Sequence, residues 1–169
     1  FKEQGAELSH IVMKEKKDGE GMEEDRVGRH VKAILEGCEA FSSDSFDCDG
    51  MVAELQSLIQ ACAASQDDDA EKVRHILPHK IKAGQLGIVA CIIRMLKSAS
   101  TLKRFKLMSA GMHTLSVLCS KCPPNLALFA TFGEGAQVLS SLLRKHAENA
   151  SVQEMGMIME RAVCTKNPE

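Results

Sequence analysis

The spacing of the apolar residues is the feature that most limits the fold. From Met51 onward they recur three and four residues apart in one segment after another, and no stretch alternates apolar with polar residues as a half-buried strand would. The sequence therefore predicts an all-α protein. Helices are expected near 51–64, 69–81, 85–98, 101–121, 124–131, 135–147 and 151–164. The second of these is expected to be disturbed at Pro78, because proline lacks the amide proton of the helix ladder.

The first 50 residues have a different character. Residues 14–30 are almost all charged residues and glycine, which predicts a mobile linker, because such a segment buries too little apolar surface to offset its ordering entropy. Apolar residues then recur at helical spacing over 27–41 and predict a short amphipathic helix, which ends at a run of Ser and Asp. We expect a mostly flexible N-terminal arm over 1–50 and helices over 51–169.

Composition narrows the range of partners. The 21 basic residues are balanced by 23 acidic ones, and Trp and Tyr are absent, so the sequence lacks the basic excess and the stacking aromatics of most nucleic-acid binders. Apolar runs fall short of the roughly 20 residues that a membrane span needs. Most of the seven cysteines lie in apolar helical patterns, which is typical of reduced core thiols. We expect a soluble protein of the cytoplasm, with the nucleus as second candidate.

The sequence also repeats. An offset of 45 positions pairs Leu107 with Val152, Gly111 with Gly156, Met112 with Met157, Leu118 with Val163, Cys119 with Cys164 and Pro123 with Pro168. Helical units of roughly 40–47 residues cannot bury their apolar faces alone and stack into solenoids. The alternative is chance similarity between amphipathic helices of an ordinary bundle, but glycines and prolines paired at one offset favour the repeat.

These segments resemble armadillo repeats. Asn125 to Phe129 is similar to the family's short first helix, Gly135 to Leu143 to its second, Ser151 to Met157 to the start of its third, and residues 166–169 to the following loop. The resemblance covers about 84–169 and implies repeats over 84–123 and 124–169, with 51–83 as a degenerate cap. It implies a right-handed α-superhelix that is truncated at the end of this sequence. The opening twelve residues and 107–118 resemble one armadillo-repeat-containing subfamily.

The resemblance implies a function as well. The subfamily has no established enzyme activity, so we expect a scaffold that binds other proteins on a concave face built from third helices, with no small-molecule substrate, cofactor or metal. Armadillo proteins that hold extended basic peptides carry a Trp and an Asn one turn apart on the third helix. Alignment places His113 and Val117 there in one repeat and Ile158 and Ala162 in the next.

Neither aligned pair keeps the Trp and the Asn, so we expect a mildly apolar groove that suits a partner helix better than an extended basic peptide. The groove could instead be covered by a neighbouring helix or by the segment around Leu8, Ile11 and Val12. Replacing Val117 and Ile158 by Asp is expected to abolish partner capture and to leave thermal stability nearly unchanged.

A local basic cluster gives the alternative function. Lys103, Arg104 and Lys106 lie close together at the start of the predicted 101–121 helix. They are either simply solvated or meet an acidic partner, and in the second case nucleic acid or anionic lipid is a candidate. Binding that weakens steeply with salt would distinguish this alternative from an apolar groove.

Three sequence patterns partly resemble a metal or redox site. Cys119 and Cys122 have the spacing of half a zinc or redox site, but no second pair accompanies them, so core thiols are the favoured interpretation. His75 and His79 could share an ion, yet Pro78 lies between them and no third ligand is evident. The sequence predicts surface histidines.

Alternating aspartates at 44, 47 and 49 resemble half of a calcium loop, but the terminal glutamate of such a loop is missing. A solvated acidic linker is favoured there. No catalytic triad, phosphate loop or dinucleotide motif occurs, so we do not expect an enzyme.

Overall fold

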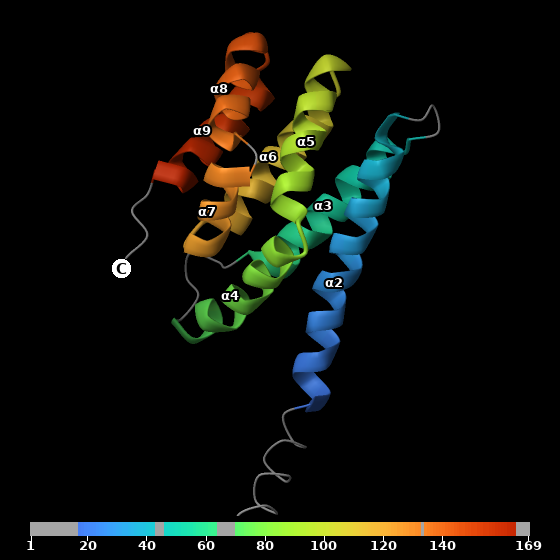
Figure 1. Ribbon diagram of the computed structural model, residues 1–169, viewed down its shortest axis with the longest axis vertical. Helices are drawn as coiled ribbons and strands as arrows, with labels where there is room; N and C mark the ends of the chain where they lie inside the picture. The colour runs from blue at the N-terminus through green and yellow to red at the C-terminus, as the bar shows by residue number, and fades with distance from the viewer. Residues whose placement is uncertain (1–16, 43–45, 64–69, 133, 165–169) are drawn as a thin grey trace, which may run out of the picture.

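The computed structural model describes residues 17–42, 46–63, 70–132 and 134–164 (Figure 1). Over these residues the protein is all-α, with eight α-helices, one short 3-10 helix and no strand. In chain order they are α2 (Lys17–Glu39), η1 (Ala40–Ser42), α3 (Cys48–Cys62), α4 (Ala70–Gln85), α5 (Ile88–Thr101), α6 (Phe105–Cys119), α7 (Pro123–Phe132), α8 (Gly135–Lys145) and α9 (Ala150–Cys164).

The seven helices predicted after residue 50 are all present, with shifted ends. Helix α4 contains Pro78 and continues to Gln85, beyond the predicted end at residue 81. The helix predicted over 101–121 begins late, because Lys103 adopts a left-handed backbone with a φ of 53° and Arg104 precedes the first turn of α6. Local backbone geometry therefore separates α5 from α6 at a point where the apolar spacing is continuous.

The prediction of a linker over residues 14–30 is wrong from Lys17 onward, because 17–39 form the single helix α2. Glu, Lys, Arg and Met in this stretch favour helices intrinsically, although Gly19 and Gly21 do not. The second half of α2 is fixed by tertiary packing, since Val27, Val31 and Ile34 are fully buried in the main core. The part of the expected arm that precedes Lys17 lies outside the described residues.

The helices pack with a regular order. Helix α4 contacts α7, α5 contacts α8, and α6 contacts α9, so each helix meets the one three places further along the chain. The same relation joins α2 to α5 and α3 to α6. Helices α3, α6 and α9 consequently form a row with α6 in the middle, which we call the α3/α6/α9 row.

Two glycines show that α6 and α9 occupy equivalent positions. A Cβ atom on Gly111 of α6 would press against side chains of α5, the nearest being those of Met95 and Leu96. A Cβ atom on Gly156 of α9 would clash with Leu143 of α8. Glycine thus permits the close approach of α5 to α6 and of α8 to α9, which explains in physical terms why the 45-residue offset pairs these two residues.

The core runs along this assembly as one cluster. Its largest fully buried side chains are Ile34, Leu55, Leu58, Ile88, Ile92, Ile93, Leu107, Met108, Met112, Leu115, Leu118 and Met159. In the part of the chain that the structure describes, no single helix has both the length and the apolar composition of a membrane span, although the bent pairs His75–Gln85 with Ile88–Thr101 and Pro123–Thr131 with Gly135–Lys145 meet those criteria jointly.

Candidate partner-binding surface of helices α3, α6 and α9

One stripe of α6 is the least buried part of the helix. Lys106, Ala110, His113 and Val117 follow one another at four-, three- and four-residue spacing, which places them on one side of the helix. Lys106 and His113 are exposed, whereas Ala110 and Val117 are half-buried. The other sides of α6 pack against α3, α5 and α9. The fold therefore brings three of the predicted site residues, Lys106, His113 and Val117, onto one surface.

Helix α9 continues this surface with a more apolar character. Ile158, the equivalent of His113, exposes 41% of its surface, and Ala162, the equivalent of Val117, is half-buried. Met157 exposes 67%, but it is the equivalent of the buried Met112 and so lies on another side of α9. Ser109 of α6 and Ser151 of α9 are joined by a hydrogen bond of 2.9 Å between their hydroxyl oxygens. The predicted pairs on α6 and α9 thus lie on neighbouring, directly packed helices.

Helix α3 supplies two surface residues that the sequence alignment missed. A single offset superposes its buried residues on those of α6, matching Met51, Leu55, Leu58 and Cys62 to Met108, Met112, Leu115 and Cys119. The same offset matches Gln56 to His113 and Gln60 to Val117, and both glutamines are exposed. The spacing of Met51, Leu55, Leu58 and Cys62, which matches the buried spacing of α6, is the sequence signal that marks these two positions.

The surface is therefore graded in polarity. The exposed residues at equivalent positions are Gln56 and Gln60 on α3, Lys106 and His113 on α6, and Ser151 and Ile158 on α9. Val117 also packs against the core from its half-buried position, so it contributes to the fold and not to the surface alone. Such an arrangement offers a polar rim beside an apolar anchor site, which is the usual anatomy of a protein–protein interface.

The basic cluster is smaller than the sequence suggested. The guanidinium carbon of Arg104 lies 4.8 Å from the ring centroid of Phe41 and 4.7 Å from that of Phe46. Its Nη1 atom is buried without a hydrogen-bond partner. Arg104 therefore joins the start of α6 to the segment between α2 and α3, and the solvated cluster is reduced to Lys103 and Lys106, both of which are exposed.

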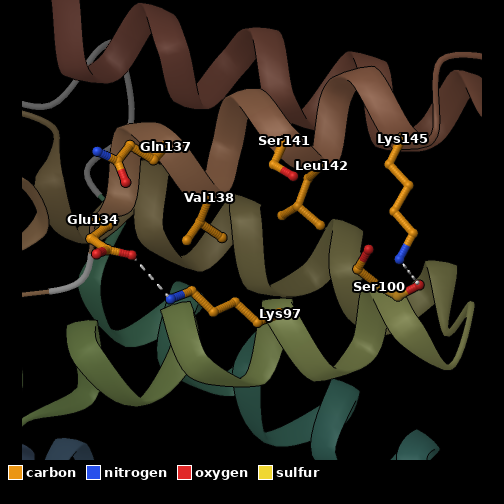
Figure 2. Close-up of a pocket in the computed structure, with 8 residues that line it drawn as sticks. All are labelled: Lys97, Ser100, Glu134, Gln137, Val138, Ser141, Leu142 and Lys145. Carbon is orange, nitrogen blue, oxygen red and sulfur yellow. Dashed lines mark hydrogen bonds and ion pairs between the residues drawn. The ribbon is translucent and has the colours of Figure 1, made fainter.

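A shallow cavity of about 340 Å³ lies between α5 and α8 (Figure 2). Lys97 approaches Glu134 to 3.4 Å at one end, and at the other Lys145 Nζ lies 3.4 Å from the carbonyl oxygen of Ser100. Val138 lies between these two contacts. Both lysines already have a partner, so the cavity presents no unpaired cation that would attract an anionic ligand.

The predicted histidine pair lines a second cavity, of about 220 Å³, to which α2, α3 and α4 contribute. His75 is exposed and His79 is half-buried. Asp47, one of the alternating aspartates, caps α3 by accepting a hydrogen bond of 2.9 Å from the amide of Gly50. Asp44 lies outside the described residues. Over the described residues, no three His, Cys, Asp or Glu side chains are grouped so that they could hold a metal ion.

Cys119 and Cys122 are completely buried. Burial, and secondarily the neighbouring Cys122, raises the pKa of Cys119 to about 12, and its Sγ donates to the carbonyl oxygen of Asn125 at 3.8 Å. Lys80 is buried beside these thiols, with Nζ donating to the Ser120 carbonyl oxygen at 3.0 Å, and burial lowers its pKa. A Cys119 thiol that stays protonated at neutral pH is a poor nucleophile and a poor metal ligand.

Sequence reasoning also missed His146, which follows α8. Its Nε2 lies 2.8 Å from Ser100 Oγ in α5, and its ring meets Phe105 edge-on with centroids 5.4 Å apart. Burial, with the charges of Lys145 and Lys103, lowers the pKa of His146. The buried His146 side chain therefore links α5 to the end of α8 through a hydrogen bond. No local sequence pattern predicts this contact.

Comparisons with protein-family models, with curated proteins and with solved structures give no match for this chain.

Proposed function

We propose that the protein is an armadillo-like right-handed superhelix that serves as a protein–protein interaction scaffold and binds a partner helix across α6 and α9. The observation that carries the proposal is the outer side of these packed helices, where Ile158 of α9 and its equivalent His113 of α6 are both exposed, with Lys106 also exposed on α6. The packing of each helix on the one three places further along is the order that stacked three-helix repeats require.

The proposed mechanism is presentation of a rigid surface. The α3/α6/α9 row is fixed by the core on its inner side, so a partner bound there does not have to order the receptor. Ile158 would receive the apolar face of an amphipathic helix, while Lys106 and Lys103 would meet acidic side chains at its edge. A few buried apolar contacts give most of the affinity of such interfaces, and the charged rim gives orientation and association rate.

Extended basic peptides are the less suitable ligand for this surface. The aligned positions carry His113 and Val117 on α6 and Ile158 and Ala162 on α9, none of which supplies an indole face or a carboxamide clamp. The exposed cations at 103 and 106 would also repel a basic ligand. A helix with an apolar stripe and acidic flanks suits both the apolar side chains and the exposed lysines of this surface. We assign the complex to the cytoplasm and expect no catalytic step.

Affinity capture with a matched pair of variants tests the proposal. Ile158→Asp places a charge on the proposed surface, whereas Leu86→Asp places one on an equally exposed aliphatic residue in the turn between α4 and α5. We expect cell-extract proteins that bind the wild-type chain to be lost with Ile158→Asp and retained with Leu86→Asp, at equal thermal stability. Equal capture by the two variants would move the binding surface elsewhere.

The alternative of nucleic-acid or anionic-lipid binding depends on Lys103, Arg104 and Lys106. The stacking of Arg104 on Phe41 and Phe46 removes one of the three cations from the solvated surface, which weakens this alternative. Capture that is lost with Lys106→Glu, retained with Ile158→Asp and steeply weakened by salt would favour it over the helix-binding surface.

A further inference from the structure

The turn between α5 and α6 combines an exposed apolar side chain with unbalanced positive charge. Leu102 exposes 53% of its surface, and the neighbouring Lys103 and Lys106 are also exposed. In the part of the chain that the structure describes, neither lysine forms an ion pair. The fold therefore leaves about half of Leu102 and both charges to solvent.

Hydrogen bonds fix the backbone of this turn. The amide of Lys103 donates to the carbonyl oxygen of Ser100 at 3.4 Å, and the amide of Arg104 donates to that of Ala99 at 2.9 Å. With the left-handed backbone of Lys103, these two bonds form a Schellman motif at the end of α5. The stacked guanidinium of Arg104 holds the turn from its other side. Leu102 and Lys103 are thus presented from a preorganised backbone, which lowers the ordering cost of binding.

Both lysines stand at places that the fold itself disfavours. Glycine is the usual residue at the left-handed position of a Schellman motif, because a Cβ atom is strained at the positive φ of 53° that Lys103 adopts. Lys106 lies in the first turn of α6, where the positive end of the helix dipole disfavours a cation. A ligand that carries negative charge would compensate both lysines at once.

A third cation adds to the positive potential at this turn. Lys145 Nζ lies 3.4 Å from the Ser100 carbonyl oxygen (Figure 2), the same atom that accepts from the Lys103 amide. A carbonyl oxygen has no net charge, so this contact places Lys145 beside the turn without balancing its charge. In agreement, the pKa of His146 is lowered by burial and then by the charges of Lys145 and Lys103. The end of α8 therefore strengthens the potential of the α5–α6 turn.

We propose that this turn is a docking point for an acidic segment of a protein partner, in which carboxylate side chains flank one apolar residue. The apolar residue packs on Leu102, and the carboxylates pair with Lys103 and Lys106. Lys145 keeps its own contact and attracts the segment through its charge. The proposal rests on the proposed function, because Lys103 and Lys106 lie at the edge of the α6 surface, and it places the acidic end of the partner there.

A protein segment suits this patch better than a membrane or a nucleic acid. Recognition of anionic lipid typically uses clusters of about four to eight basic residues, whereas the turn has three lysines and one exposed leucine. Nucleic-acid binders show a basic excess, whereas the whole chain has a net charge of −2. The number of charges and the single apolar side chain match a short acidic peptide.

NMR titration of the isotope-labelled full chain with a synthetic peptide tests the proposal. The peptide carries two glutamates on each side of a leucine and has blocked ends. We expect saturable shifts of the amide signals of Leu102, Lys103 and Lys106, and binding that weakens with added salt. Two control peptides, with the glutamates replaced by glutamine or the leucine by serine, should each bind about three- to tenfold more weakly. Binding should also raise the pKa of His146, because the carboxylates offset the nearby lysine charges.

A pair of glycine variants separates docking from folding. Lys103→Gly removes a charge and relieves the left-handed backbone, so we expect about two- to fivefold weaker peptide binding with a thermal midpoint equal to or above that of wild type. Lys121→Gly is the matched control, since Lys121 is an exposed lysine with the same φ of 53° in the turn between α6 and α7. It should bind the peptide as wild type does. Equal binding by both variants would overturn the proposal.

Ile158→Asp distinguishes this docking point from the proposed function. Ile158 lies on α9, so this variant should bind the peptide normally while it loses the captured partner. If it captures the partner normally, the proposed function fails and the docking point stands. If it loses the peptide while Lys103→Gly keeps it, the peptide binds on α9 and the docking point fails. Tighter binding of vesicles of phosphatidylcholine and phosphatidylserine, or of a short DNA duplex, than of the peptide would also overturn the proposal.

Discussion

Asn125 Nδ2 donates a hydrogen bond of 2.8 Å to the backbone carbonyl oxygen of Lys80, and so fixes the start of α7 against α4. The same nitrogen donates to the carbonyl oxygen of Leu118 near the end of α6 at 3.0 Å. Asn125 is completely buried. One amide group thus joins helices α4, α6 and α7.

Replacing this asparagine should therefore be costly. Asn125→Ala leaves two buried carbonyl oxygens without their donor, and we expect the free energy of unfolding to fall by about 1–3 kcal/mol. Urea denaturation with an unchanged m-value measures the loss. Gln137→Ala, which removes an exposed amide from α8, serves as control and should stay within roughly 0.5 kcal/mol of wild type. Equal effects of the two substitutions would show that the Asn125 hydrogen bonds contribute no net stability.

Two helical glycines should respond to alanine in opposite directions. A Cβ atom on Gly84 would clash with Asn125 Oδ1, whose side chain is held in place, so Gly84→Ala should destabilise by about 1–3 kcal/mol. A Cβ atom on Gly28 of α2 would meet nothing within 4 Å, so Gly28→Ala should stabilise by up to about 1 kcal/mol. Thermal unfolding of both variants under one set of conditions checks the prediction. A change of stability in the same direction in both variants would contradict it.

The spacing of apolar residues predicted the helices after residue 50 because each of them has a continuous apolar face. It did not predict features that depend on backbone geometry or on contacts between distant residues. The first half of α2 has no such face, so periodicity does not indicate it, and the break before α6 depends on the backbone of Lys103. The fit of Asn125 against Gly84 joins residues far apart in the chain, so no local pattern could reveal it.

The spacing of buried residues also predicts some of the exposed positions on α6 and α9. Alignment placed His113 and Ile158 at exposed positions because their register follows from the neighbouring buried residues. The local cluster of charges predicted that Arg104 is either solvated or meets an acidic partner. Its stacking on Phe41 and Phe46 arises from tertiary contacts that no local pattern shows. A charged residue in the sequence is therefore not always solvated, because an arginine can stack on aromatic side chains from another part of the chain.

Arg104 should consequently behave as a packing residue. Arg104→Ala removes a cation and an alkyl chain from two aromatic rings, and we expect a loss of about 1–3 kcal/mol in the free energy of unfolding. Arg104→Lys should restore little of it, since an ammonium group cannot stack in the same way. Lys106→Ala is the matched control on an exposed residue and should be nearly neutral. A fully restored stability in Arg104→Lys would indicate that charge alone matters.

His146 should make stability depend on pH. Because its pKa is lowered in the folded protein, mainly by burial, the unfolded chain takes up the proton at a higher pH than the folded one. The contribution of His146 is therefore complete above the unfolded pKa of about 6.5 and is lost as the pH falls below it, with a slope of at most about 1.4 kcal/mol per pH unit. His146→Gln should flatten stability between roughly pH 7 and 5, whereas His113→Gln, at an exposed position, should not.

Val117 and Ile158 should respond differently to the same charge, which corrects the expectation that Asp at both positions leaves stability unchanged. Val117 is half-buried and packs on the core, so Val117→Asp forces a carboxylate against apolar neighbours, and we expect a loss of about 2 kcal/mol or more. Ile158 exposes 41% of its surface on α9, and Ile158→Asp should change the free energy of unfolding by less than about 0.5 kcal/mol. In the proposed complex both positions are covered, so both variants should lose partner binding, but Ile158→Asp should do so with an intact fold. Thermal unfolding and partner capture measured on one preparation separate these effects. If Ile158→Asp unfolds the protein as readily as Val117→Asp, the outer side of α9 is part of the core and offers no surface to a partner helix.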